Sequence, residues 1–214
     1  MKILFVSSEC APFSKSGGLA DVAFSLPPAL QKTGDELTIV TPMYRVTQEN
    51  YGDQFSLIKT CVIHLGQRQL SCALYKGELN GVTVYAISNE HLFHRPRLYG
   101  YGDDSLRFAF FCRAVIDLLP EFGDLPDILH CNDWETALAI LYLKNDAVLN
   151  DALSHIKTVY TIHNIAYQGQ FGRSEMETTF ALPDGWYHGG LSYEFEGRQD
   201  INLMKGAMLM ADAV

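Results

Sequence analysis

The sequence contains no apolar stretch long enough to cross a membrane and no surplus of basic residues. A membrane-spanning helix needs roughly 18 or more apolar residues in a row, and the apolar run near the N-terminus is also too short for the core of a signal peptide. The formal net charge of −9, from 16 Lys and Arg against 25 Asp and Glu, argues against a broad basic face. We therefore expect a cytoplasmic protein that binds neither a membrane nor nucleic acid.

Cysteine is scarce, with five copies scattered along 214 residues and no C-x-x-C pair. This spacing favours neither a zinc site nor a disulfide framework. His91 and His94 lack a third ligand at a suitable spacing, so we expect no metal. Repeats and long linkers are also missing, which favours a single domain. The cysteines are predicted to be reduced and mostly buried: Cys10, Cys61, Cys72, Cys112 and Cys131.

Short apolar strands alternate with helices along most of the chain. Strands are expected at 3–6, 36–41, 128–131 and 158–162, and helices at 17–30, 104–119, 135–144 and 201–211. This alternation predicts an α/β fold, with a Rossmann-like parallel sheet that carries helices on both faces. Three further strands are expected at 55–65, 69–76 and 82–87, and Asn80-Gly81 predicts a hairpin between the last two. They are interpreted as an antiparallel hairpin insertion.

The segment 15–30, KSGGLADVAFSLPPAL, follows the first predicted strand. Gly17 and Gly18 open a helix whose N-terminus would suit a phosphate group, because backbone N–H groups and the helix dipole both favour an anion there. Lys15 adds a mobile cation, and Asp21 offers an acceptor for hydroxyl groups. The alternative is an ordinary strand-to-helix turn, with glycine for its conformational freedom and lysine for solubility. Taken alone, the glycine pair favours the ordinary turn.

Polar residues follow two other predicted strands, and the carboxyl ends of parallel strands meet at one edge of a sheet. Asp133 and Trp134 follow the strand 128–131, where they could bind a sugar hydroxyl and stack on a sugar ring. Asp133 also fits the N-cap of the next helix, and both roles can hold together. His163 follows the strand 158–162, a position where a single histidine is more often structural than catalytic.

Four longer strings resemble bacterial glycogen synthases and starch synthases. They are KSGGLADV with the LPPAL helix, HCNDWETAL, TIHNIAYQG and INLMKGAMLMADAV, and they extend across essentially the whole chain. Asn132 and Glu135 depart from the pattern, because many bacterial members have His at these positions. The resemblance implies a GT-B type enzyme with two Rossmann-like domains and the active site between them. Residues 1–214 would be the N-terminal, acceptor-side domain, cut off before the C-terminal nucleotide-binding domain.

The resemblance also implies the reaction. Members of the family transfer glucose from ADP-glucose to the non-reducing end of an α-1,4-glucan, with retention and without a metal or organic cofactor. The implied partners are ADP-glucose, glycogen or a maltooligosaccharide, and the missing C-terminal domain, without which we expect little or no activity. Two alternatives stay open: an isolated α-glucan-binding module without catalysis, and a homologue that uses UDP-glucose.

Site residues are carried over from the resemblance position by position. His163 would lie beside the reacting sugar and Asp133 would line the active site. The donor diphosphate would lie against Lys15, Gly17 and Gly18. The remaining substrate-binding candidates are Asp21, from the segment itself, and the residues that follow or face the motifs: Asn164, Tyr167, Gln168 and Tyr99.

Overall fold

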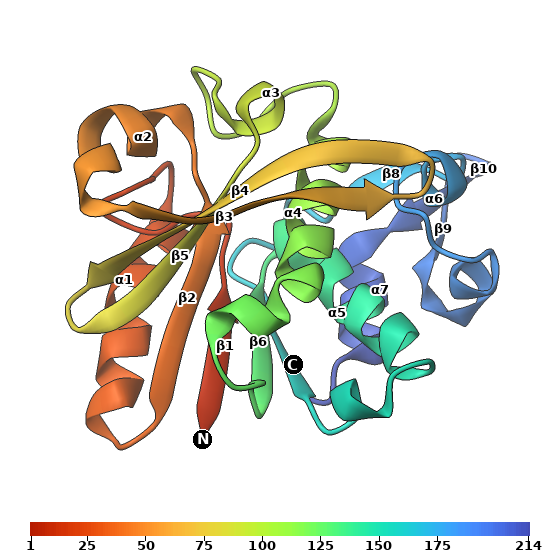
Figure 1. Ribbon diagram of the computed structural model, residues 1–214. Helices are drawn as coiled ribbons and strands as arrows, with labels where there is room; N and C mark the ends of the chain where they lie inside the picture. The colour runs from red at the N-terminus through yellow and green to blue at the C-terminus, as the bar shows by residue number, and fades with distance from the viewer.

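The computed structural model describes residues 1–214, apart from the side chain of Phe195. A seven-stranded mixed sheet in the order β3-β4-β5-β2-β1-β6-β7 forms its centre (Figure 1). Its strands are β1 Lys2–Val6, β2 Glu36–Pro42, β3 Ser56–Leu65, β4 Arg68–Leu79, β5 Val82–Ser88, β6 Ile128–Asn132 and β7 Lys157–Thr161. A second, three-stranded antiparallel sheet has the order β8-β10-β9, with β8 Gln170–Gly172, β9 Ser192–Phe195 and β10 Arg198–Asn202.

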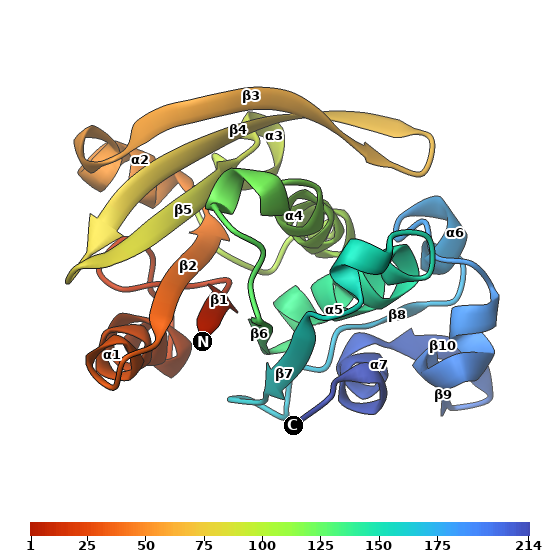
Figure 2. The same cartoon turned by 60° about the horizontal axis from the view of Figure 1, so that its bottom comes forward.

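Helices cover both faces of the large sheet, as predicted. α1 lies on one face, α4 and α5 lie on the other, and α7 packs against α5 (Figure 2). The helices are α1 Gly18–Lys32, α2 Arg45–Tyr51, α3 Glu90–Phe93, α4 Asp104–Asp117, α5 Trp134–Ala147, α6 Glu175–Thr178 and α7 Leu203–Met210. The central strand β1 shows why its sequence is apolar throughout: Ile3 and Phe5 belong to the core cluster on the α1 side. Leu4 and Val6 belong to the cluster on the α4 and α5 side.

The predicted antiparallel hairpin is present and is part of the large sheet. β4 pairs antiparallel with β3 and with β5, but β5 also pairs parallel with β2. The turn is of the expected kind, because Asn80 and Gly81 both have positive φ, 51° and 84°. The antiparallel strands therefore extend the parallel sheet at its edge.

Near the end of the chain, Ala213 forms an isolated parallel bridge with Val159 and accepts a hydrogen bond from the Tyr160 N–H at 2.9 Å. The end of the chain therefore lies beside β7. Helices α2 and α3 and the small sheet were not predicted. Their segments are short and polar, so no periodic pattern marks them.

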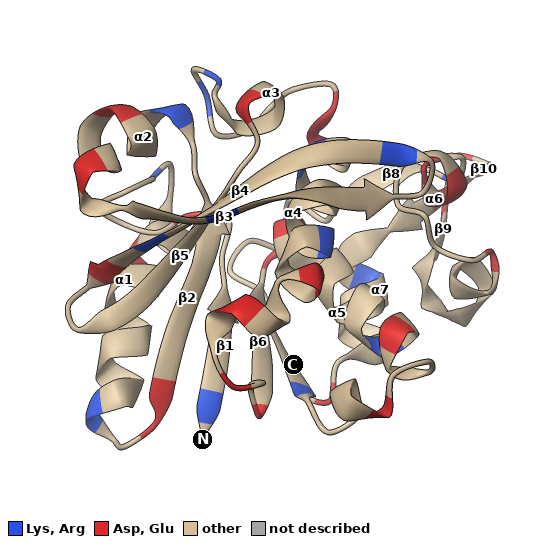
Figure 3. Cartoon of the chain, viewed as in Figure 1, with Lys and Arg blue, Asp and Glu red and all other residues tan. Residues whose placement is uncertain are grey.

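Four of the five cysteines are buried, as predicted, and Cys61 is partly exposed. Acidic and basic residues are interspersed over the described elements, and no helix or strand carries a run of basic residues (Figure 3). Within the part of the chain that the structure describes, no helix combines the length and hydrophobicity that a bilayer span requires.

Candidate active site

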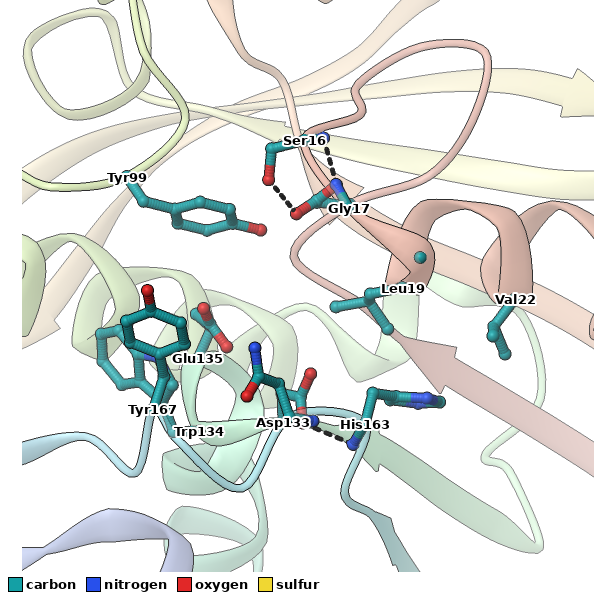
Figure 4. A pocket seen from close by; sticks show the side chains of 13 residues that line it. Ser16, Gly17, Leu19, Val22, Tyr99, Asp133, Trp134, Glu135, His163 and Tyr167 are labelled. Carbon is teal, nitrogen blue, oxygen red and sulfur yellow. Dashed lines mark hydrogen bonds between the residues drawn. The ribbon is translucent and has the colours of Figure 1, made fainter.

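A cavity of about 530 Å³ lies at the carboxyl ends of β1, β6 and β7 (Figure 4). Segments far apart in the sequence form its walls, as expected for the carboxyl edge of parallel strands. Seven of the ten predicted site residues line it: Gly17, Gly18, Tyr99, Asp133, His163, Asn164 and Tyr167. The other lining residues are Glu9, Ser16, Leu19, Val22, Trp134 and Glu135.

The other three predicted residues are not in the cavity wall, because other groups hold their side chains. The Lys15 Nζ and Asp21 Oδ1 atoms form an ion pair at 2.5 Å, with 52% and 60% of the two side chains exposed. Asp21 is thus engaged by Lys15 instead of being a free hydroxyl acceptor. Gln168 accepts a hydrogen bond from Asn202 Nδ2 at 2.7 Å and donates to the Ile165 carbonyl at 3.0 Å. It fastens the loop after β7 to the start of α7.

The loop between β1 and α1 is folded around the buried carboxylate of Glu9. This carboxylate accepts hydrogen bonds from the Ser16 N–H at 2.5 Å, the Ser16 hydroxyl at 2.6 Å and the Gly17 N–H at 3.1 Å. Of the two glycine N–H groups that the sequence suggested for an anion, that of Gly17 is therefore already occupied. The unpaired N–H groups of a helix N-terminus start here at Gly18. No sequence pattern pointed to Glu9, because its partners lie seven and eight positions further along the chain.

Asp133 occupies the N-cap position of α5, but its side chain makes no cap hydrogen bond, which corrects the sequence prediction. Its backbone has φ 57° and ψ 177°, a conformation that non-glycine residues rarely adopt. Its carboxylate instead accepts hydrogen bonds from the N–H groups of His163 at 2.7 Å and Asn164 at 3.2 Å. Asp133 therefore ties the end of β6 to the loop that follows β7.

The imidazole of His163 is held by a second contact. Its Nε2 lies 2.9 Å from Asn132 Oδ1, and the amide nitrogen of Asn132 donates to the Val6 carbonyl at 3.0 Å. Because this orientation turns the amide oxygen toward the ring, Nε2 carries the proton and donates it to Oδ1. In the neutral ring, Nδ1 is then free to accept a hydrogen bond. The chain Val6–Asn132–His163 joins the ends of three neighbouring strands.

His130 lies on β6, two residues before Asn132, and is neutral at physiological pH. Burial and the nearby His163 lower the pKa of His130 to about 4. Its Nε2 lies 2.8 Å from the Thr161 hydroxyl. His163 is therefore the histidine that the cavity exposes to a ligand.

Aromatic side chains form another part of the cavity wall. The Tyr99 hydroxyl shares a hydrogen bond with the Ser8 hydroxyl at 2.9 Å, and burial raises the Tyr99 pKa well above its usual value. Trp134 is packed edge-on against Phe108, with ring centres 5.3 Å apart. Tyr167 is 67% exposed at the cavity mouth. Flat rings at a polar cavity can stack on the apolar faces of sugar rings.

The fold, with its cavity at the carboxyl edge of parallel strands, is that of a Rossmann-like ligand-binding domain. Among such domains, the chain belongs to the starch synthase catalytic domain family, because its sequence matches that family over residues 2–214. The resemblance to glycogen and starch synthases that the sequence motifs indicated is thereby confirmed, and so is the predicted fold class.

Individual relatives support the same assignment. The chain is 42% identical to a glycogen synthase from Bacillus cereus over 214 residues, which are the whole of this chain and 44% of the relative. A glycogen synthase from Anoxybacillus flavithermus is 39% identical over 215 residues, with the same shares. Among solved structures, the catalytic domain of starch synthase IV from Arabidopsis thaliana, bound to ADP and acarbose, superposes with a TM-score of 0.85 at 28% identity. That match covers 99% of this chain and 43% of the Arabidopsis chain, so the chain spans less than half the length of these relatives.

Proposed function

We propose that residues 1–214 form the N-terminal, acceptor-side domain of a two-domain glycogen or starch synthase. The reaction is retaining transfer of glucose from ADP-glucose to the non-reducing end of an α-1,4-glucan, and a cytoplasmic location is part of the same proposal. The observation that carries it is the meeting of the α1 N-terminus, Asp133 and His163 on one cavity. The family membership supports it, as does the Arabidopsis relative, which binds ADP and acarbose.

The cavity offers a separate group for each part of the reaction. The N-terminus of α1 from Gly18 onward, together with Lys15 in the preceding loop, would stabilise the departing diphosphate. His163 would contact the transferred glucose. Asp133 and Asn132 hold His163 in one orientation. The rings of Tyr99, Trp134 and Tyr167 are the groups suited to the glucan. These roles need no metal, and no group of metal-ligating side chains occurs among the described residues.

The second domain is required for charge balance. None of the residues that line the cavity is Lys or Arg, and the nearby Lys15 is already paired with Asp21. Glu9, Asp133 and Glu135 instead place three carboxyl groups in its wall. A diphosphate would therefore meet too little positive charge from this chain alone. We expect residues 1–214 in isolation to have little or no transferase activity, and measurable turnover by them would contradict this.

The test is incorporation of glucose from ADP-glucose into glycogen by the protein that carries this chain together with its second domain. Lys15→Ala and His163→Ala are the comparison variants, and UDP-glucose is the alternative donor. Transfer that falls sharply in both variants supports the proposal. Transfer from UDP-glucose alone would make the protein a UDP-glucose-dependent homologue. Glucan binding without transfer from either donor would leave a glucan-binding module as its function.

A further inference from the structure

Glu135 has no partner for one of its carboxyl oxygens, although the side chain is buried. The residue is the second of α5, it lines the cavity, and it is only 9% exposed. Its Oε2 atom is fully buried and has no hydrogen-bond partner among the described residues. Figure 4 shows the carboxyl group turned into the cavity, on the side of Tyr99 and away from His163. A buried carboxyl oxygen without a partner is costly, and more so when the group is ionised, so this geometry favours the protonated acid.

The other two carboxyl groups of the cavity wall, unlike Glu135, accept hydrogen bonds from other residues. Glu9 accepts three hydrogen bonds from Ser16 and Gly17, and Asp133 accepts two from the loop after β7. Donors from the protein therefore already engage both of these carboxyl groups. Glu135 has no such donor from another residue; the contact with its own backbone N–H is the one that favours its charge.

The groups around Glu135 come from every element packed against it, and they disfavour a further negative charge. Three are carboxylates: Asp133 at the end of β6, Glu9 after β1 and Asp104 on α4. Arg107, on α4, is bound to Asp104 and donates to the Leu92 carbonyl at 2.7 Å. The remaining titratable neighbours are neutral hydroxyls and a thiol, since burial raises the pKa of each: Tyr44, Tyr99, Tyr160 and Cys112.

Burial in this setting, helped by the neighbouring carboxylates, raises the pKa of Glu135 to about 8. At neutral pH the group is therefore an uncharged carboxylic acid, with one O–H that donates and one C=O that accepts. A sugar hydroxyl matches such a group, because it accepts and donates in the same way. An approaching diphosphate would favour the uncharged form further, since like charges repel.

We propose that Glu135 binds substrate in its uncharged form, as a hydrogen-bond donor to a glucosyl hydroxyl group in the cavity. This rests on the proposed function. Glu135 lies on the side of the cavity that carries Tyr99, one of the rings suited to the glucan, so we take the glucan acceptor as the source of that hydroxyl. The transferred glucose of the donor is the other source with the same chemistry. The two sources are separated by measuring the KM of each substrate.

The experiment uses the two-domain protein and compares wild type with Glu135→Ala and Glu135→Gln. Glutamine donates and accepts like an uncharged carboxylic acid but does not titrate. We expect Glu135→Ala to raise the KM for maltoheptaose on the order of tenfold, and Glu135→Gln to restore most of the loss. Wild-type kcat/KM should fall above pH 8, roughly tenfold for each further pH unit, while Glu135→Gln stays level there. A rise in the KM for ADP-glucose instead would assign the hydroxyl to the donor sugar.

Glu175→Gln is the matched control, because Glu175 Oε2 is also buried without a partner but does not line the cavity. It should keep the wild-type pH profile. Two outcomes would show that the ionised form binds: transfer that rises with pH, or a Glu135→Gln variant as impaired as Glu135→Ala. Either one would overturn this inference and leave the proposed function standing.

A readout without catalysis separates the two proposals. In the carbon-13 NMR spectrum of protein labelled at the glutamate carboxyls, we expect one resonance that titrates near pH 8 and is missing in Glu135→Gln. If the wild type transfers no glucose, the proposed function fails. The inference is then decided by maltoheptaose binding, which must weaken above pH 8 in the wild type and not in Glu135→Gln. Binding independent of pH would overturn it.

Discussion

The carboxylate of Asp133 accepts a hydrogen bond from the backbone N–H of His163 at 2.7 Å, across the gap between the ends of β6 and β7. The same carboxylate holds the next N–H, that of Asn164, at 3.2 Å. Since Asn132 holds the His163 ring from the same strand end, both the backbone and the imidazole are positioned by neighbouring residues of one segment. Asp133 can therefore affect catalysis without touching a substrate.

Replacement of Asp133 by alanine should lower kcat more than it changes either KM. It leaves two N–H groups without their acceptor, and we expect about 1–3 kcal/mol of this loss to reach the barrier, which is a fall in kcat on the order of ten- to hundredfold. Asp133→Gly is the control, because glycine accepts the positive φ of 57° without strain. It should lose as much activity as Asp133→Ala but unfold at a higher temperature. A kcat within twofold of wild type in Asp133→Ala would contradict this role.

Loss of the Glu9 carboxylate should loosen the loop that leads into α1. Glu9→Ala leaves the N–H groups of Ser16 and Gly17 and the Ser16 hydroxyl without an acceptor. We expect a melting temperature lower by several degrees and a higher KM for ADP-glucose, because the glycine pair no longer has a fixed shape. Ser16→Ala removes the hydroxyl contact alone and should have the smaller effect in both assays. Equal effects of the two variants would show that the backbone contacts of Glu9 do not matter.

Two glycines near the cavity should respond in opposite ways to substitution by alanine. A Cβ on Gly169 would lie 2.7 Å from Trp134 Cε3, and its φ is +63°, so Gly169→Ala should destabilise the fold and displace the indole. A Cβ on Gly17 would meet nothing within 4 Å, and Gly17→Ala should fold normally. If the donor diphosphate approaches this backbone, Gly17→Ala still lowers kcat/KM for ADP-glucose. Normal activity in Gly17→Ala would show that the glycine serves only the turn.

The sequence predicts which residues meet at the cavity, but not the contacts that each of them makes there. The meeting of Gly17, Asp133 and His163 could be predicted, because each follows an apolar strand and parallel strands present their carboxyl ends at one edge. The contacts that give these residues their final state could not be predicted. Glu9 binds the N–H of Gly17, and Asp133 binds the loop after β7 instead of capping α5. Both contacts join groups that meet only in the folded chain.

For Lys15 and Glu135, the sequence motif does not report the side-chain partner or the burial that decides their state. The motif indicates Lys15, but the structure places it outside the cavity wall, in an ion pair with Asp21. Glu135 stands where many bacterial members of the family have His, so the motif assigns it no role. Its state depends on burial, and no local pattern reports burial at a single position.

Lys15→Ala should impair donor use without affecting stability. The Lys15–Asp21 pair is more than half exposed, and such surface pairs contribute about 0–1 kcal/mol. We therefore expect a melting temperature close to that of wild type and a kcat/KM for ADP-glucose lower by a factor of ten or more. Lys32→Ala, at the opposite end of α1, is the control and should change neither value. A Lys15→Ala protein that melts early but transfers glucose normally would assign a structural role to Lys15.

The stability of the fold should depend on pH through Glu135. Its pKa is about 8 in the folded state, against an ordinary value of 4.5 that the unfolded chain would have. Because the folded state binds the proton more tightly, the stabilisation is fully present below pH 4.5 and is lost as pH rises through 8.

Urea unfolding of the two-domain protein, followed by a probe in this domain, measures the effect at pH 6 and pH 9. We expect wild type to lose up to a few kcal/mol relative to Glu135→Gln over this interval, and Glu175→Gln to follow wild type. A wild-type protein that becomes more stable relative to Glu135→Gln as pH rises would mean that Glu135 is buried as an anion. The uncharged donor in the cavity would then be ruled out as well, because one ionisation state governs both stability and sugar binding.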